Sequence, residues 1–336
     1  MSNDIIEIAI EKYRATRPNT FICPNAALAD LSKSVLNGFG VFNIERKGYR
    51  VNEVISIYDD KTDLPYKWQS YSELDKITHD AVVSLYMDGN RVLSLDMLCR
   101  TITGKDNVST DHKQAVKESL IKLMGTIIQI KGTYQGKEYT PFTGNLIYAK
   151  IVTVNINGQI IEDAIEILDR PVLYSYSQSR NQVLSYPVSL LSAGGKSSTR
   201  ATITKHVMLG RIERIKNSRE RIKNPKNRIS DCITYDAIYD AAKARTKIEK
   251  QRVRNLIHKQ LDDLIQQEYI IGYKIKSENY SRYHSIQILC KDTPLEMIPD
   301  SPKSDTIPPR SDTLAPTKTA PKQLTNKELQ EMTKTL

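Results

Sequence analysis

The sequence has few of the residues that build disulfide frameworks, metal sites or membrane spans. Its 336 residues include four cysteines and five histidines. They contain no Cys-x-x-Cys pair and no cysteine at metal-ligand spacing from a histidine, which argues against a structural zinc site and a disulfide framework. No apolar run approaches the roughly 18 residues that a membrane span needs. Residues 1–13 are acidic and amphipathic, unlike a signal peptide. We expect a cytoplasmic protein with no membrane partner.

Patterns of catalytic and nucleotide-binding residues are also missing. The histidines form no His-x-His pair, so the metal site of a rolling-circle nicking enzyme is absent. There is no His-Glu-x-x-His motif and no glycine-rich dinucleotide turn. Residues 195–197 read Gly-Lys-Ser, but Leu190 stands where a phosphate-binding loop needs its first glycine. We therefore expect a protein without enzymatic activity, cofactor or metal.

Positive charge is present in excess and is concentrated in one segment. The chain has a net charge of +10 and an isoelectric point near 9.2. Residues 196–259 contain 18 lysines and arginines against six acidic residues, an excess of 12 that is larger than the charge of the whole chain. A solvated helix face ordinarily mixes both signs, so this excess favours nucleic acid as the partner. A basic surface without a ligand is the alternative.

The C-terminal segment, residues 292–336, differs in composition from the rest. It holds seven of the 14 prolines and no aromatic residue, so it cannot bury enough apolar surface to fold alone. Thr325 and Glu328 form a capping-box pattern near its end. We expect a disordered tail. A short terminal helix that binds a partner protein and a frayed end without a function are the two alternatives for its last residues.

The same order of predicted elements occurs twice in the chain. The first copy has helices over 72–87 and 94–104, a helix from Thr110 or Asp111, a strand at 127–130, a turn at 135–137 and a returning strand at 145–155. Asn157-Gly158 then marks a tight hairpin. The second copy has a helix over 203–215, a basic loop over 216–228, a short helix from Thr234, a long helix over 246–267 and strands at 269–273 and 285–289.

Helix, short helix, long helix and β-hairpin in this order are typical of a winged-helix module. We therefore predict an α+β fold with two winged-helix modules in tandem. The N-terminal extension has a helix over 4–15, a second helix over 25–36 and a β-hairpin around Lys47-Gly48. The predicted boundaries are 1–60 for this extension, 70–168 for the first module, 169–199 for a connector, 200–291 for the basic second module and 292–336 for the tail.

The third helix of a winged-helix module enters the major groove of DNA. In the second module its basic N-terminal half runs against the helix dipole, which indicates a basic end placed for a ligand. We predict base contacts from Arg254 and Gln251, because arginine and glutamine form bidentate contacts with guanine and adenine. Phosphate contacts are predicted for Arg245, Lys247 and Lys250. Further predicted DNA contacts are Arg219, Arg221, Lys223, Lys226 and Arg228 in the basic loop, Lys274, Lys276 and Arg282 in the second wing, and Lys113, Gln114, Lys117 and Lys137 in the first module.

The tandem arrangement resembles plasmid and mobile-element replication initiators. The resemblance covers residues 70–290 and rests on the architecture and on the segments Leu93–Leu98 and Ile233–Ile238. It implies a bacterial protein that binds repeated origin sites in double-stranded DNA, represses its own gene as a homodimer and recruits host replication proteins, here through the tail. Two other classes remain open: a transcriptional repressor or conjugation accessory protein, and a winged-helix adaptor that binds protein.

Overall fold

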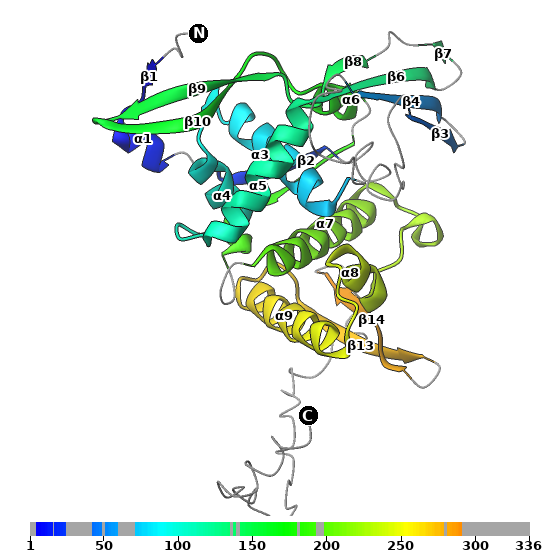
Figure 1. The fold of residues 1–336 in the computed structure, drawn as a ribbon. Coiled ribbons are helices and arrows are strands. Elements are labelled where there is room, and N and C mark those ends of the chain that lie inside the picture. Colours follow the sequence, from blue (N-terminus) through cyan, green and yellow to red (C-terminus); the bar gives the residue numbers. More distant parts are fainter. Residues whose placement is uncertain are drawn as a thin grey trace, which may run out of the picture. The chain divides into compact units, whose positions relative to one another are not determined.

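The computed structural model describes residues 5–15, 17–24, 42–48, 51–59, 71–134, 137–138, 142–179, 182–192, 198–278 and 281–290. All of these residues belong to one compact unit, which lies within residues 1–298. The predictions for residues 25–36 and for the tail lie outside the described residues. Within them, the fold is mixed α+β, with eight α-helices and four small sheets (Figure 1).

The two predicted copies of the element order are named the first and second repeats. Three helices begin the first repeat, and each of them starts at a serine cap. They are α3 (Glu73–Met87), α4 (Leu95–Thr103) and α5 (Thr110–Met124). Ser72 and Ser94 cap α3 and α4 as predicted, because each side chain accepts a hydrogen bond from the exposed amide of the third helical residue. The cap of α5 is Ser109, one residue earlier than predicted.

A four-stranded sheet combines strands from before, between and after these helices, in the order β1-β9-β10-β5. Its members are β1 (Ile5–Glu7), β5 (Val92–Leu93), β9 (Ala149–Ile156) and β10 (Gln159–Ile167). The turn between β9 and β10 is the predicted Asn157-Gly158 pair, with φ of +49° and +85°. Asparagine and glycine tolerate this left-handed backbone, which matches the twist of a hairpin.

The wing predicted for the first repeat is wrong, because its first strand lies in a second sheet. It is formed by β3 (Phe42–Gly48), β4 (Val51–Asp59), β6 (Thr126–Tyr134), β7 (Lys137–Glu138) and β8 (Phe142–Asn145). The order is β3-β4-β6-β7, and β8 also pairs with β6. Strands β6 and β7, on either side of the predicted turn, therefore belong to a sheet built with β3 and β4. The hairpin that pairs with β5, the strand after the first helix, is β9–β10 instead.

The N-terminal extension and the connector also pair with each other. They contain α1 (Ile10–Ala15), β2 (Thr20–Pro24), α6 (Val172–Ser179), β11 (Val183–Pro187) and the 3-10 turn η1 (Val188–Leu191). Strand β2 pairs with β11, and β1 pairs with β9. The helix predicted over 4–15 is thus wrong in its first half, since Ile5–Glu7 is a strand. The apolar residues of this segment are compatible with a strand as well as with one face of a helix.

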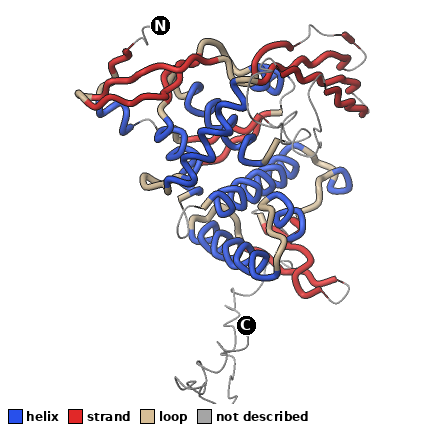
Figure 2. Tube along the Cα trace, in the orientation of Figure 1, coloured by secondary structure: helices blue, strands red, loops and turns tan. Residues whose placement is uncertain are grey.

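The second repeat has the order helix, strand, helix, helix and hairpin; in the first repeat β6, β7 and β8 come between the third helix and the hairpin. It contains α7 (Thr199–Arg221), the 3-10 turn η2 (Pro225–Asn227), β12 (Cys232–Thr234), α8 (Tyr235–Ala241), α9 (Lys247–Gln266), β13 (Gly272–Glu278) and β14 (Ser281–Leu289). The three strands are ordered β12-β14-β13. Figure 2 shows the β13–β14 hairpin extending beyond the helices of this repeat.

Both repeats share one topology. A strand after the first helix pairs with the second strand of the hairpin that follows the third helix: β5 with β10, and β12 with β14. Helix α7 contacts α3 of the first repeat and also α8 and α9 of the second. It is longer than predicted, because residues 216–221, expected in a loop, continue the helix.

A buried polar cluster joins α7 to the first repeat. The Tyr186 hydroxyl donates to Nδ1 of His206 at 2.7 Å, and Nε2 of His206 donates to the Ile102 carbonyl at 2.7 Å. Phe21 packs on the imidazole with 4.5 Å between ring centroids. Burial lowers the pKa of His206 to about 3, so the ring is neutral at physiological pH.

Candidate nucleic-acid interface

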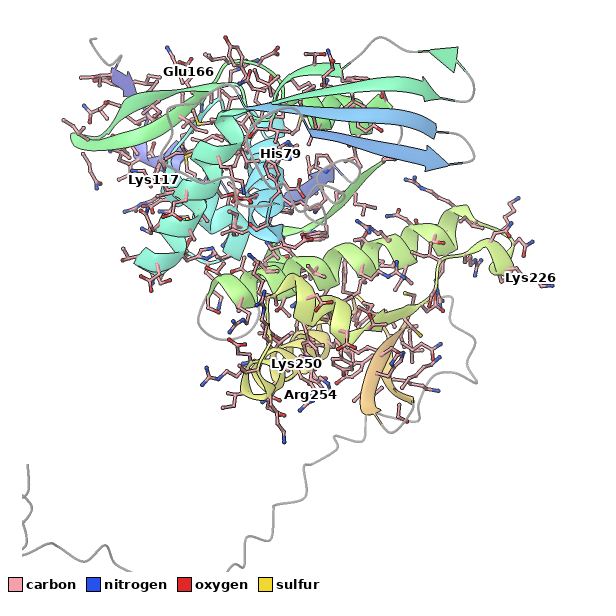
Figure 3. The ribbon with its side chains drawn as sticks, turned by 45° about the vertical axis from the view of Figure 1, so that its right-hand side comes forward. His79, Lys117, Glu166, Lys226, Lys250 and Arg254 are labelled. Atoms are coloured by element: carbon pink, nitrogen blue, oxygen red, sulfur yellow. The ribbon has the colours of Figure 1, made fainter. Side chains whose placement is uncertain are left out.

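The first turns of α9 bring together five of the predicted DNA contacts. Arg245 lies in the turn before the helix and is exposed, as are Lys247 and Gln251. Lys250 and Arg254 are half-buried, and both side chains project from α9 (Figure 3). The apolar stripe predicted for this helix is buried at Val253, Ile257, Leu261 and Leu264.

A capping box fixes the start of α9. Thr246 accepts from the backbone amide of Glu249, and Oε2 of Glu249 accepts from the backbone amides of Thr246 and Arg245 at 3.0 and 2.9 Å. These backbone hydrogen bonds are the main reason that the pKa of Glu249 falls to about 2. Arg200 of α7 donates to Oε1 of the same carboxylate at 2.8 Å. The acid at this position offsets the dipole conflict inferred from the sequence, because a carboxylate stabilises a helix N-terminus.

The polar side chains of α9 are ordered by contacts along the helix. Arg254 donates to Oε1 of Gln251, and Nε2 of Gln251 donates to Oδ1 of Asn255 at 3.0 Å. Lys250 lies over the ring of Tyr239, with 5.3 Å from its Nζ to the ring centroid. These contacts restrict the rotamers of the predicted DNA-binding residues before any ligand arrives, which lowers the entropic cost of binding.

The β13–β14 hairpin follows α9 and carries the predicted wing contacts. Lys274 is half-buried and Lys276 exposed, both on β13. Arg282 lies on β14, but its side chain is outside the described residues. The Tyr273 hydroxyl donates to Asp262 at 3.2 Å and so ties the hairpin to the acidic end of α9.

The basic segment after α7 divides into supporting and exposed residues. Arg219 forms a bidentate ion pair with Asp231, at 2.6 and 3.2 Å, and its side chain is only 8% exposed. Arg219, predicted to contact DNA, is thus paired with a carboxylate of the fold. Nε of Arg228 donates to the Ile222 carbonyl at 2.8 Å. The exposed members are Arg221, Lys223 and Lys226.

These exposed residues lie apart from α9 along the molecule. Figure 3 shows Lys226 at the far end of α7, away from Lys250 and Arg254. The loop around η2 is held by Arg211, which donates to the Ser230 carbonyl at 3.1 Å, and by Ser218, which accepts from the Ile229 amide at 3.0 Å. A phosphate contact here would belong to a different part of a ligand from the one that α9 meets.

The first repeat does not gather its predicted contacts in the same way. Lys113 is paired with Asp96 of α4 at 2.6 Å, and Gln114 donates to Glu118 at 2.9 Å. Lys117 is half-buried on α5 (Figure 3). Lys137 is on β7 of the second sheet, which pairs with β6 rather than with the β9–β10 hairpin.

The start of α5 is also covered by the second repeat. His112 of α5 is fully buried, and its Nδ1 lies 3.1 Å from the Thr199 hydroxyl of α7. Burial lowers the pKa of His112, which favours the neutral ring. The sequence could not show this contact, because Thr199 is 87 residues away along the chain.

Several exposed residues of α9 are not among the predicted DNA contacts. Arg252, Asn255 and Lys259 are all exposed, and the side chain of Ile248 is 66% exposed. Their spacing of three and four residues was the available signal, because it places them on one helix face. At about 100° per residue, Lys250 lies about 200° and Arg254 about 240° around the helix from Ile248, so these two predicted contacts lie outside this face.

Other kinds of site were sought in the described part of the chain. Those residues contain no group of three or more histidine, cysteine or acidic side chains placed to hold a metal ion. None of the helices among them has the length and apolarity to cross a bilayer.

Comparison with known proteins gives remote structural neighbours. No family model matches the chain, and no curated protein sequence matches it. The chain is similar to a crystal structure of a selenomethionine derivative of domains 2 and 3 of RctB, with 11% identity, a TM-score of 0.39, and coverage of 76% of this chain and 92% of that chain. A second crystal structure of RctB domains 2–3 covers 75% of this chain and 85% of that chain, with 12% identity and a TM-score of 0.39.

Proposed function

We propose that this chain is a non-enzymatic protein that binds double-stranded DNA through α9 and the β13–β14 hairpin. The proposal treats both repeats as winged-helix modules. It is supported by the shared topology, in which the strand after the first helix pairs with the far strand of the terminal hairpin. In such a module the third helix lies in the major groove, which assigns α9 to the bases.

The composition of the exposed face of α9 carries this proposal. Every fully exposed side chain from Lys247 to Lys259 is basic, amide or apolar, and none is acidic. The one acid in this stretch, Glu249, is engaged by Arg200 and by the backbone at the start of the helix. A surface with fixed cations and amide groups suits a polyanion whose base edges offer hydrogen-bond partners.

The two repeats differ in what they offer to DNA. The third helix of the first repeat has a buried start at His112 and an ion pair at Lys113. We therefore assign sequence recognition to the second repeat and a secondary or architectural role to the first. Lys223 and Lys226 would add phosphate contacts at a separate position on the duplex.

The biological role is proposed from the tandem arrangement described from the sequence. It is replication initiation on a bacterial plasmid or mobile element, in the cytoplasm, with a homodimer and host replication proteins as further partners. Repression of transcription and an accessory role in conjugation use the same DNA-binding surface. A direct-repeat array beside the gene would favour initiation, and an inverted repeat alone would favour repression.

The test is a mobility-shift titration of the full-length chain on the DNA that flanks its own gene, over a salt series with competitor DNA. Arg252→Ala and Lys250→Ala change the proposed surface. Lys12→Ala on α1 is the matched control, because this exposed lysine lies on a helix packed against α4 through the Tyr13–Asp96 contact. Each lost phosphate contact should reduce the slope of log K against log salt by about 0.9.

We expect sequence-specific binding that the Lys12 variant retains and the α9 variants weaken. A shallower salt slope in Lys250→Ala would identify a phosphate contact. Binding that is equally strong in all three variants would remove α9 from the interface. A lack of any duplex affinity at moderate salt would replace the DNA-binding proposal with that of a protein adaptor.

A further inference from the structure

One apolar side chain stands out on the polar face of α9. Ile248 is the second residue of the helix, and its side chain is 66% exposed, more than any other large apolar residue that the structure describes. Nine residues separate it from Ile257, which at about 100° per residue places the two on opposite sides of the helix. Ile257 is fully buried. Ile248 therefore makes no contribution to the core stripe of α9.

The neighbours of Ile248 on this face are all polar. Gln251, Arg252 and Asn255 are three, four and seven residues further on, and all three are exposed. A single exposed isoleucine is unremarkable on a protein surface in general. Here it lies at the start of a basic helix whose adjacent side chains carry the groups that read base edges.

Duplex DNA offers few apolar groups in its major groove. The base edges present hydrogen-bond donors and acceptors, and the C5-methyl group of thymine is the apolar exception. An isoleucine between amide and guanidinium groups fits a site that contains such a methyl group. An isoleucine side chain has nothing to offer a phosphate, because phosphates are contacted by charged and hydrogen-bonding groups.

We propose that Ile248 is a specificity-determining residue that packs against the C5-methyl of one thymine in the DNA site. This inference rests on the proposed function. Loss of one buried methyl group corresponds to a loss in affinity of about fourfold. Binding of the α9 face therefore discriminates thymine from uracil, which differs only by that methyl.

The experiment begins with selection of a binding site from a random duplex library by the full-length protein. Each thymine of the selected site is then replaced singly by deoxyuridine, and Kd is measured for the native protein and for Ile248→Ala. Ile151→Ala is the matched control, because this isoleucine is 56% exposed but lies on β9. Alanine is a good helix former, so the variant at position 248 keeps α9 intact.

We expect one deoxyuridine substitution to weaken binding of the native protein and of Ile151→Ala by about fourfold. The same substitution should leave the affinity of Ile248→Ala unchanged, because this variant has already lost the side chain that contacts the methyl group. The four affinities form a double-mutant cycle that measures this one contact. Equal sensitivity of all three proteins at every thymine would overturn the role of Ile248 while leaving DNA binding by α9 in place. Failure to select any site, with no duplex affinity, would overturn both proposals together.

Discussion

Acidification is expected to destabilise this fold through His206. Nε2 of the ring donates to the Ile102 carbonyl, so in the neutral ring Nδ1 has no proton and accepts a hydrogen bond from the Tyr186 hydroxyl. Protonation would place a second proton between Nδ1 and that hydroxyl. The Tyr186 hydroxyl cannot relieve this by ionising, because burial raises its pKa well above the ordinary value. The charged ring would also be out of reach of water.

The magnitude follows from the shift in pKa. His206 has an ordinary pKa of 6.5 and a pKa of about 3 in the fold, lowered chiefly by burial. The unfolded chain therefore takes up a proton below pH 6.5 that the folded chain refuses. Stability from this residue is complete above pH 6.5 and declines as the pH falls toward 3. Each pH unit in that window removes about 1.4 kcal/mol, so acidification from 6.5 to 5 costs about 2 kcal/mol.

Urea unfolding followed by circular dichroism at pH 7, 6 and 5 measures this dependence. His206→Gln removes the titration and offers an amide that can donate to Ile102 and accept from Tyr186. The variant should lose stability less steeply than the native protein, by about 2 kcal/mol over the interval from pH 6.5 to 5. Burial also lowers the pKa of His112 and His258, so both proteins retain a slope. His284→Gln on β14 is the control, and equal slopes in all three proteins would refute the reasoning.

Three further predictions concern stability and the start of α9. Gly104→Ala should destabilise the fold by about 1–3 kcal/mol in urea unfolding, because its φ is +66° and a Cβ atom would lie 2.7 Å from the Ser192 backbone nitrogen. Arg219→Ala should cost about 1–3 kcal/mol through the orphaned Asp231, whereas Lys226→Ala, at an exposed residue, should leave the unfolding midpoint unchanged. Glu249→Gln should speed hydrogen exchange at the Thr246 amide. In the native protein the protection of this amide, taken relative to its intrinsic exchange rate at each pH, should likewise fall as the pH falls from about 4.5 to 2, since the depressed pKa means that the capping contribution is complete above that range.

Helix starts could be predicted from the sequence because capping is a local interaction. Ser72, Ser94 and Thr246 each reach the backbone amide three residues on, so the pattern of a hydroxyl before an apolar run contains the needed information. The Asn157-Gly158 turn is local in the same sense, because its left-handed backbone is a property of the two residues themselves.

Strand partners could not be predicted in this way. The segment 127–145 looks like a wing that follows the third helix, and its turn at 135–137 supports that interpretation. Its main partner, however, is β4, more than 65 residues earlier, with Ile55 opposite Ile130 in the register. The alternation of apolar residues identifies a strand but carries no record of which strand lies beside it.

The candidate site was predicted in part for the same physical reason. Helical spacing places four predicted residues on the first turns of α9, and Arg245 lies just before the helix. Arg219 was assigned to DNA from its charge, although Asp231, 12 residues later, binds it inside the fold. Charge identifies a basic segment, whereas only the folded chain shows which cations already have a carboxylate partner.

The first two residues of α7 connect the starts of α5 and α9. Thr199 contacts His112 at the start of α5, and the next residue, Arg200, binds both the Glu249 carboxylate and the Ala242 carbonyl before α9. The beginnings of the two third helices are therefore fixed to adjacent positions on one helix. His206 holds the same helix to the first repeat through Ile102. A DNA ligand that displaces α9 must work against these contacts, so the two repeats should respond to DNA as one body rather than as independent modules.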